Sequence, residues 1–264
     1  MPDRETVNIR PSVGYLSILQ AINYRAWYAI AEFVDNSLQS YLHSKTKLKK
    51  LHGNNFKLKI AIYVTPTKIK IVDNAAGIGE EDYQRAFRAA ARPENRQGLS
   101  EFGMGMKTAA CWFSKNWVVQ TKPLGEKNLK IVKWDITNIV NDDIEELDVK
   151  KTPLPVNQHY TEITLTDLNR VPRGQTIKKI KDHLASMYRC FLEKNEVEIR
   201  YNNEKLKYTK PEALQAPYFR DIDDQKKNPK KINWEKKFDF KYGNKKNATG
   251  FASIRETAST KDAG

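Results

Sequence analysis

The sequence predicts an α/β protein in two layers, a mostly antiparallel mixed sheet with helices on one face. Three observations predict this class. Residues 22–37 repeat apolar side chains at spacings of three and four, as a helix buried on one side does. Residues 58–64 and 68–71 alternate apolar with polar side chains, as strands of a half-buried sheet do. Strands and helices do not alternate regularly along the chain, which argues against a doubly wound parallel sheet.

The first elements follow from these patterns. Residues 13–43 are expected to form one long helix or two joined helices, followed by a basic loop at 45–53. The two alternating runs that come next are separated by Thr65-Pro66-Thr67, and a short proline-containing break of this kind predicts a β-hairpin. We then expect a short helix at 80–90 and a mobile polar loop at 92–101, because that loop contains proline, asparagine and glycine.

The remaining elements complete the sheet and one more helix. A helix should begin near Gly105, followed by strands at 117–121, 129–136 and 160–166, with an acidic loop at 141–148. Further along, the predicted elements are an amphipathic helix at 174–194 with Met187 on its core side, a hairpin at 196–208, and strand-like alternation at 238–255.

Composition indicates a globular protein with a substantial core. The chain has 264 residues, of which 39% are apolar, enough for one large or two medium domains. Its two cysteines, Cys111 and Cys190, form no disulfide framework, and we expect Cys111 to be a packing residue. No apolar run approaches the roughly twenty residues of a membrane span. These features predict a soluble protein without a membrane partner, in the cytoplasm or nucleus.

The net charge of +14 favours polyanionic partners such as DNA or RNA. Much of the excess falls late in the chain, at Lys226, Lys227, Lys230, Lys231, Lys236, Lys237, Lys241, Lys245 and Lys246. A solvated, solubilising surface explains the same charge, because charge alone shows no groove and no base-reading residue.

The first motif that carries chemistry is Glu32-Phe33-Val34-Asp35-Asn36. Glu32 and Asn36 are one helical turn apart, so their oxygen-bearing side chains leave the helix as neighbours. A carboxylate so placed can act as a general base on water, and an amide oxygen suits Mg²⁺. The alternative for this pair by itself is a solvated helix flank.

The second motif, Asp73-Asn74-Ala75-Ala76-Gly77-Ile78-Gly79, follows an apolar strand. Its glycines let the backbone approach a flat ligand closely, and the Asp73 carboxylate can accept a hydrogen bond from the amino group of a base. The alternative is an ordinary turn at the end of a strand.

The third motif is the glycine-rich stretch 98–109, which leads into a predicted helix with Lys107 in its first turn. Helix N-termini bind phosphate through free amide groups and the helix dipole, and a lysine adds a full positive charge. The spacing differs from that of a Walker A loop. A flexible helix start is the alternative.

These three motifs, in this order, resemble the N, G1 and G2 boxes of the GHKL superfamily. That superfamily contains gyrase-type topoisomerases, ninety-kilodalton heat-shock chaperones, histidine kinases and MutL, and the microrchidia (MORC) ATPases share the boxes. The strand Tyr160-Thr161-Glu162-Ile163-Thr164-Leu165 is similar to a further family strand, Gly-Thr-x-Ile-x-Leu. The resemblance covers residues 17–168 and is closest in style to the gyrase, MutL and MORC members. It implies the Bergerat ATP-binding fold.

Carried over by motif, the resemblance implies a role for each residue. Glu32 becomes the general base, Asn36 the Mg²⁺ ligand, and Asp73 the reader of the adenine amino group, while Asp35 orients its neighbours or the water around the metal. The other nucleotide-pocket residues that it implies are Gly77, Ile78, Gly79, Gly98, Phe102, Gly103, Met104, Gly105, Met106, Lys107, Thr108 and Thr161.

The sequence departs from the family pattern at two positions. Ala75 replaces the usual glycine two residues after the adenine-reading aspartate, and Tyr160 replaces the glycine before the pocket threonine. The first is a small change that the pocket can accept. The second puts the placement of the 160–166 strand in question.

The resemblance implies an ATP-binding and ATP-hydrolysing domain at residues 1–170. We expect residues 171–264 to begin a transducer-like domain that continues past Gly264, where relatives supply a lysine to the γ-phosphate. The leading hypothesis is a Mg²⁺-dependent ATPase that dimerises with itself when ATP binds. The alternatives are a nucleic-acid-binding clamp in which ATP is only a structural switch, and a histidine-kinase domain, which the form of the Glu32 motif disfavours.

Overall fold

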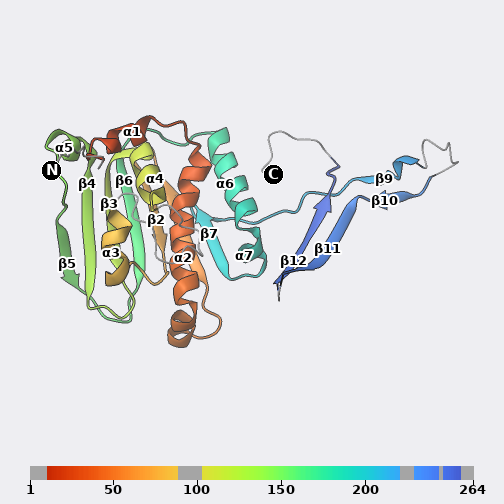
Figure 1. The fold of residues 1–264 in the computed structure, drawn as a ribbon, viewed down its shortest axis with the longest axis horizontal. Coiled ribbons are helices and arrows are strands. Elements are labelled where there is room, and N and C mark those ends of the chain that lie inside the picture. The colour runs from red at the N-terminus through yellow and green to blue at the C-terminus, as the bar shows by residue number, and fades with distance from the viewer. Residues whose placement is uncertain (1–10, 89–102, 221–228, 244–245, 257–264) are drawn as a thin grey trace, which may run out of the picture. The chain divides into compact units, whose positions relative to one another are not determined.

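The computed structural model describes residues 11–88, 103–220, 229–243 and 246–256. The chain divides into two compact units, Met1–Tyr208 and Thr209–Gly264. The first unit contains a sheet of eight strands and the helices that cover it (Figure 1). Among its described residues, no helix is long and apolar enough to cross a membrane.

The sheet is mixed and mostly antiparallel, as the sequence predicts. Its strands are β1 (Leu58–Val64), β2 (Lys68–Asp73), β3 (Ser114–Lys122), β4 (Asn128–Asp135), β5 (Val149–Pro153), β6 (Tyr160–Leu168), β7 (Val197–Tyr201) and β8 (Glu204–Lys205). They lie side by side in the order β5-β4-β3-β6-β2-β1-β7-β8. In this sheet β1 and β7 run parallel, and the other neighbouring strands pair antiparallel. The predicted hairpin is confirmed as β1 and β2.

The helices form the second layer. They are α1 (Tyr15–Ala21), α2 (Ala26–His52), α3 (Glu80–Phe87), α4 (Gly105–Phe113), α5 (Ile136–Asn141), α6 (Gln175–Met187) and α7 (Arg189–Glu193). Helices α2, α3, α4 and α6 lie on one face of the sheet (Figure 1). The two-layer α/β class is therefore confirmed.

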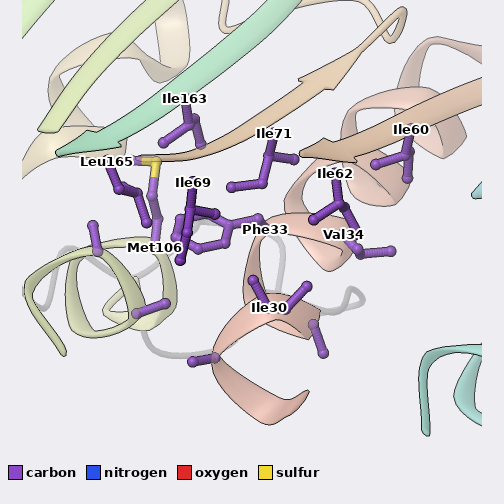
Figure 2. Packing of buried hydrophobic residues seen from close by; sticks show 14 of the residues in the cluster. Ile30, Phe33, Val34, Ile60, Ile62, Ile69, Ile71, Met106, Ile163 and Leu165 are labelled. Carbon is purple, nitrogen blue, oxygen red and sulfur yellow. The ribbon is translucent and has the colours of Figure 1, made fainter. Parts of the chain in front are cut away.

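The core lies between α2 and the sheet. Helix α2 buries Ile30, Phe33 and Val34 against alternate apolar residues of the strands, and Met106 of α4 closes one side (Figure 2). The strand residues in this layer are Ile60, Ile62, Ile69, Ile71, Ile163 and Leu165. Because side chains alternate along a strand, every second residue of β1, β2 and β6 points to the helices.

Helix α2 is longer than the sequence analysis predicts. It continues to His52, so the basic loop expected at 45–53 is wrong. Leu48 is fully buried and extends the apolar stripe by further turns. The helix ends where Gly53 adopts a φ of +91° and donates its N–H to the Lys49 carbonyl.

The acidic loop expected at 141–148 is confirmed over residues 142–148, but two elements beside it were not predicted and one predicted helix needs correction. The acidic stretch after β4 is preceded by helix α5, because Asp135 caps that helix by accepting a hydrogen bond from the Asn138 N–H at 3.1 Å. Strand β5 follows that stretch and adds an edge to the sheet. The helix expected at 174–194 breaks at Tyr188 into α6 and α7, and Met187 is 43% exposed instead of lying in the core.

The second unit contains two small antiparallel sheets. Strands β9 (Gln215–Pro217) and β10 (Lys231–Asn233) form one, and β11 (Glu235–Tyr242) and β12 (Lys246–Ser253) form the other. The alternation at 238–255 is confirmed as strand structure. The assignment of residues 171–264 to a transducer-like domain stays a prediction. Residues up to Tyr208 belong to the first compact unit.

The packing of α2 yields a stability prediction. Leu38 is 1% exposed, and Leu42, one turn later, is 39% exposed. We expect Leu38→Ala to lower the free energy of unfolding by about 2–5 kcal/mol, because it leaves a cavity against the sheet. The matched change Leu42→Ala should lower it by less than about 1 kcal/mol. Urea unfolding of both variants tests this, and equal losses would contradict the observed burial.

Candidate functional site

Three polar side chains, Asp73, Thr161 and Thr121, lie side by side across strands β2, β6 and β3 and form a polar row next to the buried apolar residues of the sheet. Asp73 follows Ile69 and Ile71 on the helix-facing side of β2, so alternation directs it beneath α2. Asp73 pairs with Thr161 of β6, and Thr161 pairs with Thr121 of β3. The Thr121 and Thr161 hydroxyl oxygens lie 3.2 Å apart. The glycine-to-Tyr160 departure therefore does not displace Thr161, which lies beside Asp73.

Asp73 is a buried carboxylate held by hydrogen-bond donors. It is 6% exposed, and it accepts hydrogen bonds from Ser37 Oγ at 2.7 Å and from the Ala75 N–H at 2.8 Å. Burial raises the pKa of Asp73 to about 6, although these donors and the Thr161 backbone favour the charged form. A buried acceptor of this kind can bind the amino group of a base.

Helix α2 carries the predicted base and metal ligand next to this row. Ser37 bonds Asp73, so Asn36 and Glu32, which precede it on the helix, lie along the same end of the sheet. The Asn36 side chain is half-buried and makes no hydrogen bond within the part of the chain that the structure describes.

Glu32 lies against the first residue of α4. A Cβ atom added to Gly105 would come 1.9 Å from Glu32 Oε2, so a side chain at this position would require the carboxylate to move. The close approach places the backbone at the start of α4 against the predicted base. The structure thus joins the first and third sequence motifs by direct contact.

Asp35, three residues after Glu32, is held by a tyrosine. Tyr188 Oη donates to Asp35 Oδ1 at 2.7 Å and lies 3.1 Å from the Ala31 carbonyl oxygen. Burial raises the pKa of Asp35 and the charge of Glu32 raises it further, while the tyrosine hydrogen bond lowers it. This contact ties the junction of α6 and α7 to α2.

The Gly77-Ile78-Gly79 turn packs on the end of β3. Gly77 has a φ of +75°, and an added Cβ would come 2.6 Å from the Lys122 carbonyl oxygen, so this position requires glycine. The Ile78 N–H donates to Thr121 Oγ1 at 2.8 Å, and Gly79 caps α3. The turn is thereby fixed to the polar row.

Lys107 does not extend freely from the start of α4. It is 2% exposed, and its Nζ donates to the Ala86 carbonyl oxygen at 2.7 Å, at the end of α3. Burial and, to a smaller extent, the nearby Arg85 lower the pKa of Lys107 to about 8. The predicted contact with phosphate stays a prediction.

The other predicted residues of the glycine-rich motif are placed as follows. Gly98 and Phe102 lie outside the described residues. Gly103, Met104 and Thr108 are partly exposed around the start of α4. The Met106 side chain packs in the core, so only its backbone groups could contact a ligand (Figure 2).

The sequence analysis missed four residues that build this site. Ser37 hydrogen-bonds Asp73, and Thr121 accepts a hydrogen bond from the Ile78 N–H. Strand alternation could have identified Thr121, because it lies two residues after the buried Val119. Tyr24 and Tyr188 bond Glu32 and Asp35. No spacing rule relates Tyr188 to a carboxylate 153 residues away.

The raised pKa of Asp73 predicts how stability depends on pH. The folded state holds the proton more tightly than the unfolded chain, whose ordinary pKa is 3.8. Ionisation of Asp73 therefore lowers stability as pH rises from about 4 to about 6, and the full loss remains above that range. Asp73→Asn removes this titration, so the stability of the variant relative to the parent should rise across this window by on the order of 2 kcal/mol.

Urea unfolding at several pH values measures this difference. The exposed Asp142 supplies the control change Asp142→Asn, which should follow the parent at every pH. Parallel stability curves for Asp73→Asn and the parent would contradict the prediction.

Comparison with known proteins identifies a matching family. The family model described as histidine kinase-, DNA gyrase B- and HSP90-like ATPases matches residues 24–167. Among curated protein sequences, none matches the chain.

Two solved structures are similar in fold. The ATPase and transducer domains of DNA topoisomerase II from Balamuthia mandrillaris are 14% identical, with a TM-score of 0.48 over 68% of this chain and 48% of that one. The ATPase region of Saccharomyces cerevisiae topoisomerase II is 12% identical, with a TM-score of 0.48 over 69% of this chain and 49% of that one. The chain thus spans about half the length of these structures.

The family model covers more than half of the 264 residues and includes Glu32, Asn36, Asp73, Gly105 and Thr161. The chain belongs to the family of histidine kinase-, DNA gyrase B- and HSP90-like ATPases.

Proposed function

We propose that this chain binds ATP together with Mg²⁺ and hydrolyses it at the site formed by α2, β2 and the start of α4. One observation carries the proposal. Glu32 of α2 contacts Gly105 at the start of α4, and a helix start is a typical place for phosphate to bind. Ser37, also in α2, hydrogen-bonds Asp73. Helix α2 therefore contacts both the region suited to a nucleobase, at Asp73, and the region suited to phosphates, at the start of α4.

The base end would be bound at the polar row. The Asp73 carboxylate would accept a hydrogen bond from the adenine amino group, and the Thr121 and Thr161 hydroxyls lie beside it. The phosphate end would be bound at α4, whose first N–H groups and dipole attract anions. Gly105 supports this assignment, since it leaves the backbone bare next to Glu32.

The residues present fit a magnesium ion. Within the described part of the chain, no three histidine, cysteine or acidic side chains form a metal cluster. Asn36 would supply one amide oxygen, and phosphate oxygens and waters would complete the shell, which is how Mg²⁺ is commonly held with nucleotides. When bound, Mg²⁺ neutralises phosphate charge.

Glu32 would act as the general base. Its carboxylate takes a proton from a water whose oxygen bonds to the γ-phosphorus, while the bond from that phosphorus to the β–γ bridging oxygen breaks. The products are ADP and inorganic phosphate. We further propose that bound ATP favours self-association, by shifting an existing equilibrium between open and closed forms.

The change Glu32→Ala tests the catalytic role. It should lower ATP turnover by about a hundredfold or more, because the base is lost, and leave the affinity for a non-hydrolysable ATP analogue nearly unchanged. Phosphate release and calorimetric titration measure the two quantities. The exposed Glu193 provides a control change, Glu193→Ala, which should keep full turnover. Loss of analogue binding in a folded Glu32→Ala variant would remove the proposed role.

A second candidate function is a nucleic-acid clamp in which ATP acts as a structural switch. The net charge of +14 favours it, as do the exposed lysines of the second unit. The described ones are Lys210, which pairs with Glu235, and Lys230, Lys231, Lys236, Lys237 and Lys241. Strand β11 also exposes Phe238 and Phe240, and aromatic side chains are surfaces on which bases stack.

A change of four lysines to glutamate tests this candidate. Reversing Lys230, Lys231, Lys236 and Lys237 should weaken binding to a short duplex DNA and reduce its salt dependence, by up to about 0.9 in log–log slope for each phosphate that is no longer neutralised. A control reverses the same number of exposed lysines in the first unit, Lys127, Lys133, Lys150 and Lys151. Equal weakening in both variants, or binding that does not respond to salt, would argue against a DNA-binding surface on the second unit.

A further inference from the structure

We propose that Tyr24 is a positioning residue for Glu32. Its hydroxyl holds one carboxylate oxygen, so that the other oxygen faces the start of α4. This inference rests on the proposed function of Glu32 as the base. It adds a residue that lies outside the nucleotide motifs, in the segment between α1 and α2.

The contact itself is short and directed. Tyr24 Oη donates to Glu32 Oε1 at 2.8 Å, within the range of a good hydrogen bond. Burial raises the pKa of Tyr24, and its hydrogen bond to Glu32 and the negative charges of Glu32 and Asp35 raise it further. The phenol therefore stays protonated at neutral pH and remains a donor while Glu32 is a carboxylate.

The two oxygens of Glu32 have different neighbours. A Cβ added to Gly105 would lie 1.9 Å from Oε2 and 3.5 Å from Oε1, so Oε2 is the oxygen that faces α4. Tyr24 occupies Oε1. With one oxygen bonded and the other packed on a backbone, the plane of the carboxylate is fixed. The oxygen next to the phosphate-binding end is the one free to accept a proton from water.

Helix α4 also holds Tyr24 in place. Trp112 of α4 donates its indole N–H to the Ile22 carbonyl oxygen at 3.1 Å, which fixes the segment before α2. The Tyr24 and Trp112 rings meet edge to face, with their centroids 6.0 Å apart at 87°. Arg170 lies 4.6 Å from the Trp112 ring centroid and donates to its carbonyl oxygen at 2.7 Å. One helix thus sets the neighbours of both Glu32 oxygens.

The variant Tyr24→Phe isolates this hydrogen bond. It keeps the ring on Trp112 and removes the donor, so Glu32 can rotate away from the water. We expect kcat for ATP to fall by about tenfold to a hundredfold, because small misplacements of a catalytic group cost factors of this size. The dissociation constant of a non-hydrolysable ATP analogue should change by less than about twofold, since Tyr24 lies outside the predicted nucleotide contacts.

The matched control is Tyr28→Phe. Tyr28 lies in the first turn of α2, is 49% exposed, and its hydroxyl makes no hydrogen bond among the described residues. Its removal should leave kcat at the parent value. A double variant, Tyr24→Phe with Glu32→Gln, should hydrolyse ATP in single-turnover experiments no more slowly than Glu32→Gln alone, because Tyr24 acts through Glu32.

The outcomes separate this inference from the proposed function. An unchanged kcat in Tyr24→Phe overturns the inference, as does an equal loss of kcat in the Glu32→Gln background. Weakened analogue binding together with a lower melting temperature overturns it as well, since that pattern marks a purely structural role. Absence of ATP hydrolysis by the parent chain, or full hydrolysis by Glu32→Ala, would instead remove the proposed function.

Discussion

The hydrogen bond between Ser37 and Asp73 joins the helix layer to the sheet at the point where the site is built. It places α2 in register with the end of β2, and this register brings Glu32 and Asn36 to the same end of the molecule as Asp73. Without a polar partner, a carboxylate under α2 would be strongly destabilising. The raised pKa of Asp73 shows that burial outweighs its donors. Leucine or isoleucine would continue the apolar pattern of β2, so the carboxylate at this position interrupts that pattern at a cost in stability.

The positions of several candidate-site residues could be predicted because they follow local rules. Glu32 and Asn36 follow helical spacing, and Asp73 and Thr161 follow strand alternation, so each position depends on its own segment. Tyr24 and Tyr188 do not, because they reach the carboxylates of α2 from outside it. For Lys107, the local pattern predicts the position in the helix but not the contact that its side chain makes. Its place in the first turn of a helix suggests a free cation, while the packing of α3 turns it onto the Ala86 carbonyl.

The fold was predictable to a similar degree and for similar reasons. Strong alternation in β1 and β2 specified the hairpin. The end of α2 was misplaced because the lysines around Leu48 conceal one buried position, although Gly53 is a readable stop signal. Strand β5 pairs at the edge of the sheet with mostly exposed side chains, so its pattern carries little hydrophobic signal. Its formation depends on β4, which lies elsewhere in the sequence.

Helix α4 connects the parts of the site that the sequence motifs treat as separate. Its first residue touches Glu32, Lys107 holds the end of α3, and Trp112 holds the segment that carries Tyr24. A phosphate bound at the start of α4 would therefore act on a helix whose position fixes three neighbours at once. These contacts are partly buried and join α4 to three separate segments, so a shift of α4 would disturb Glu32, the end of α3 or the segment of Tyr24. If the proposed function holds, a phosphate bound at the start of α4 would therefore influence the orientation of Glu32.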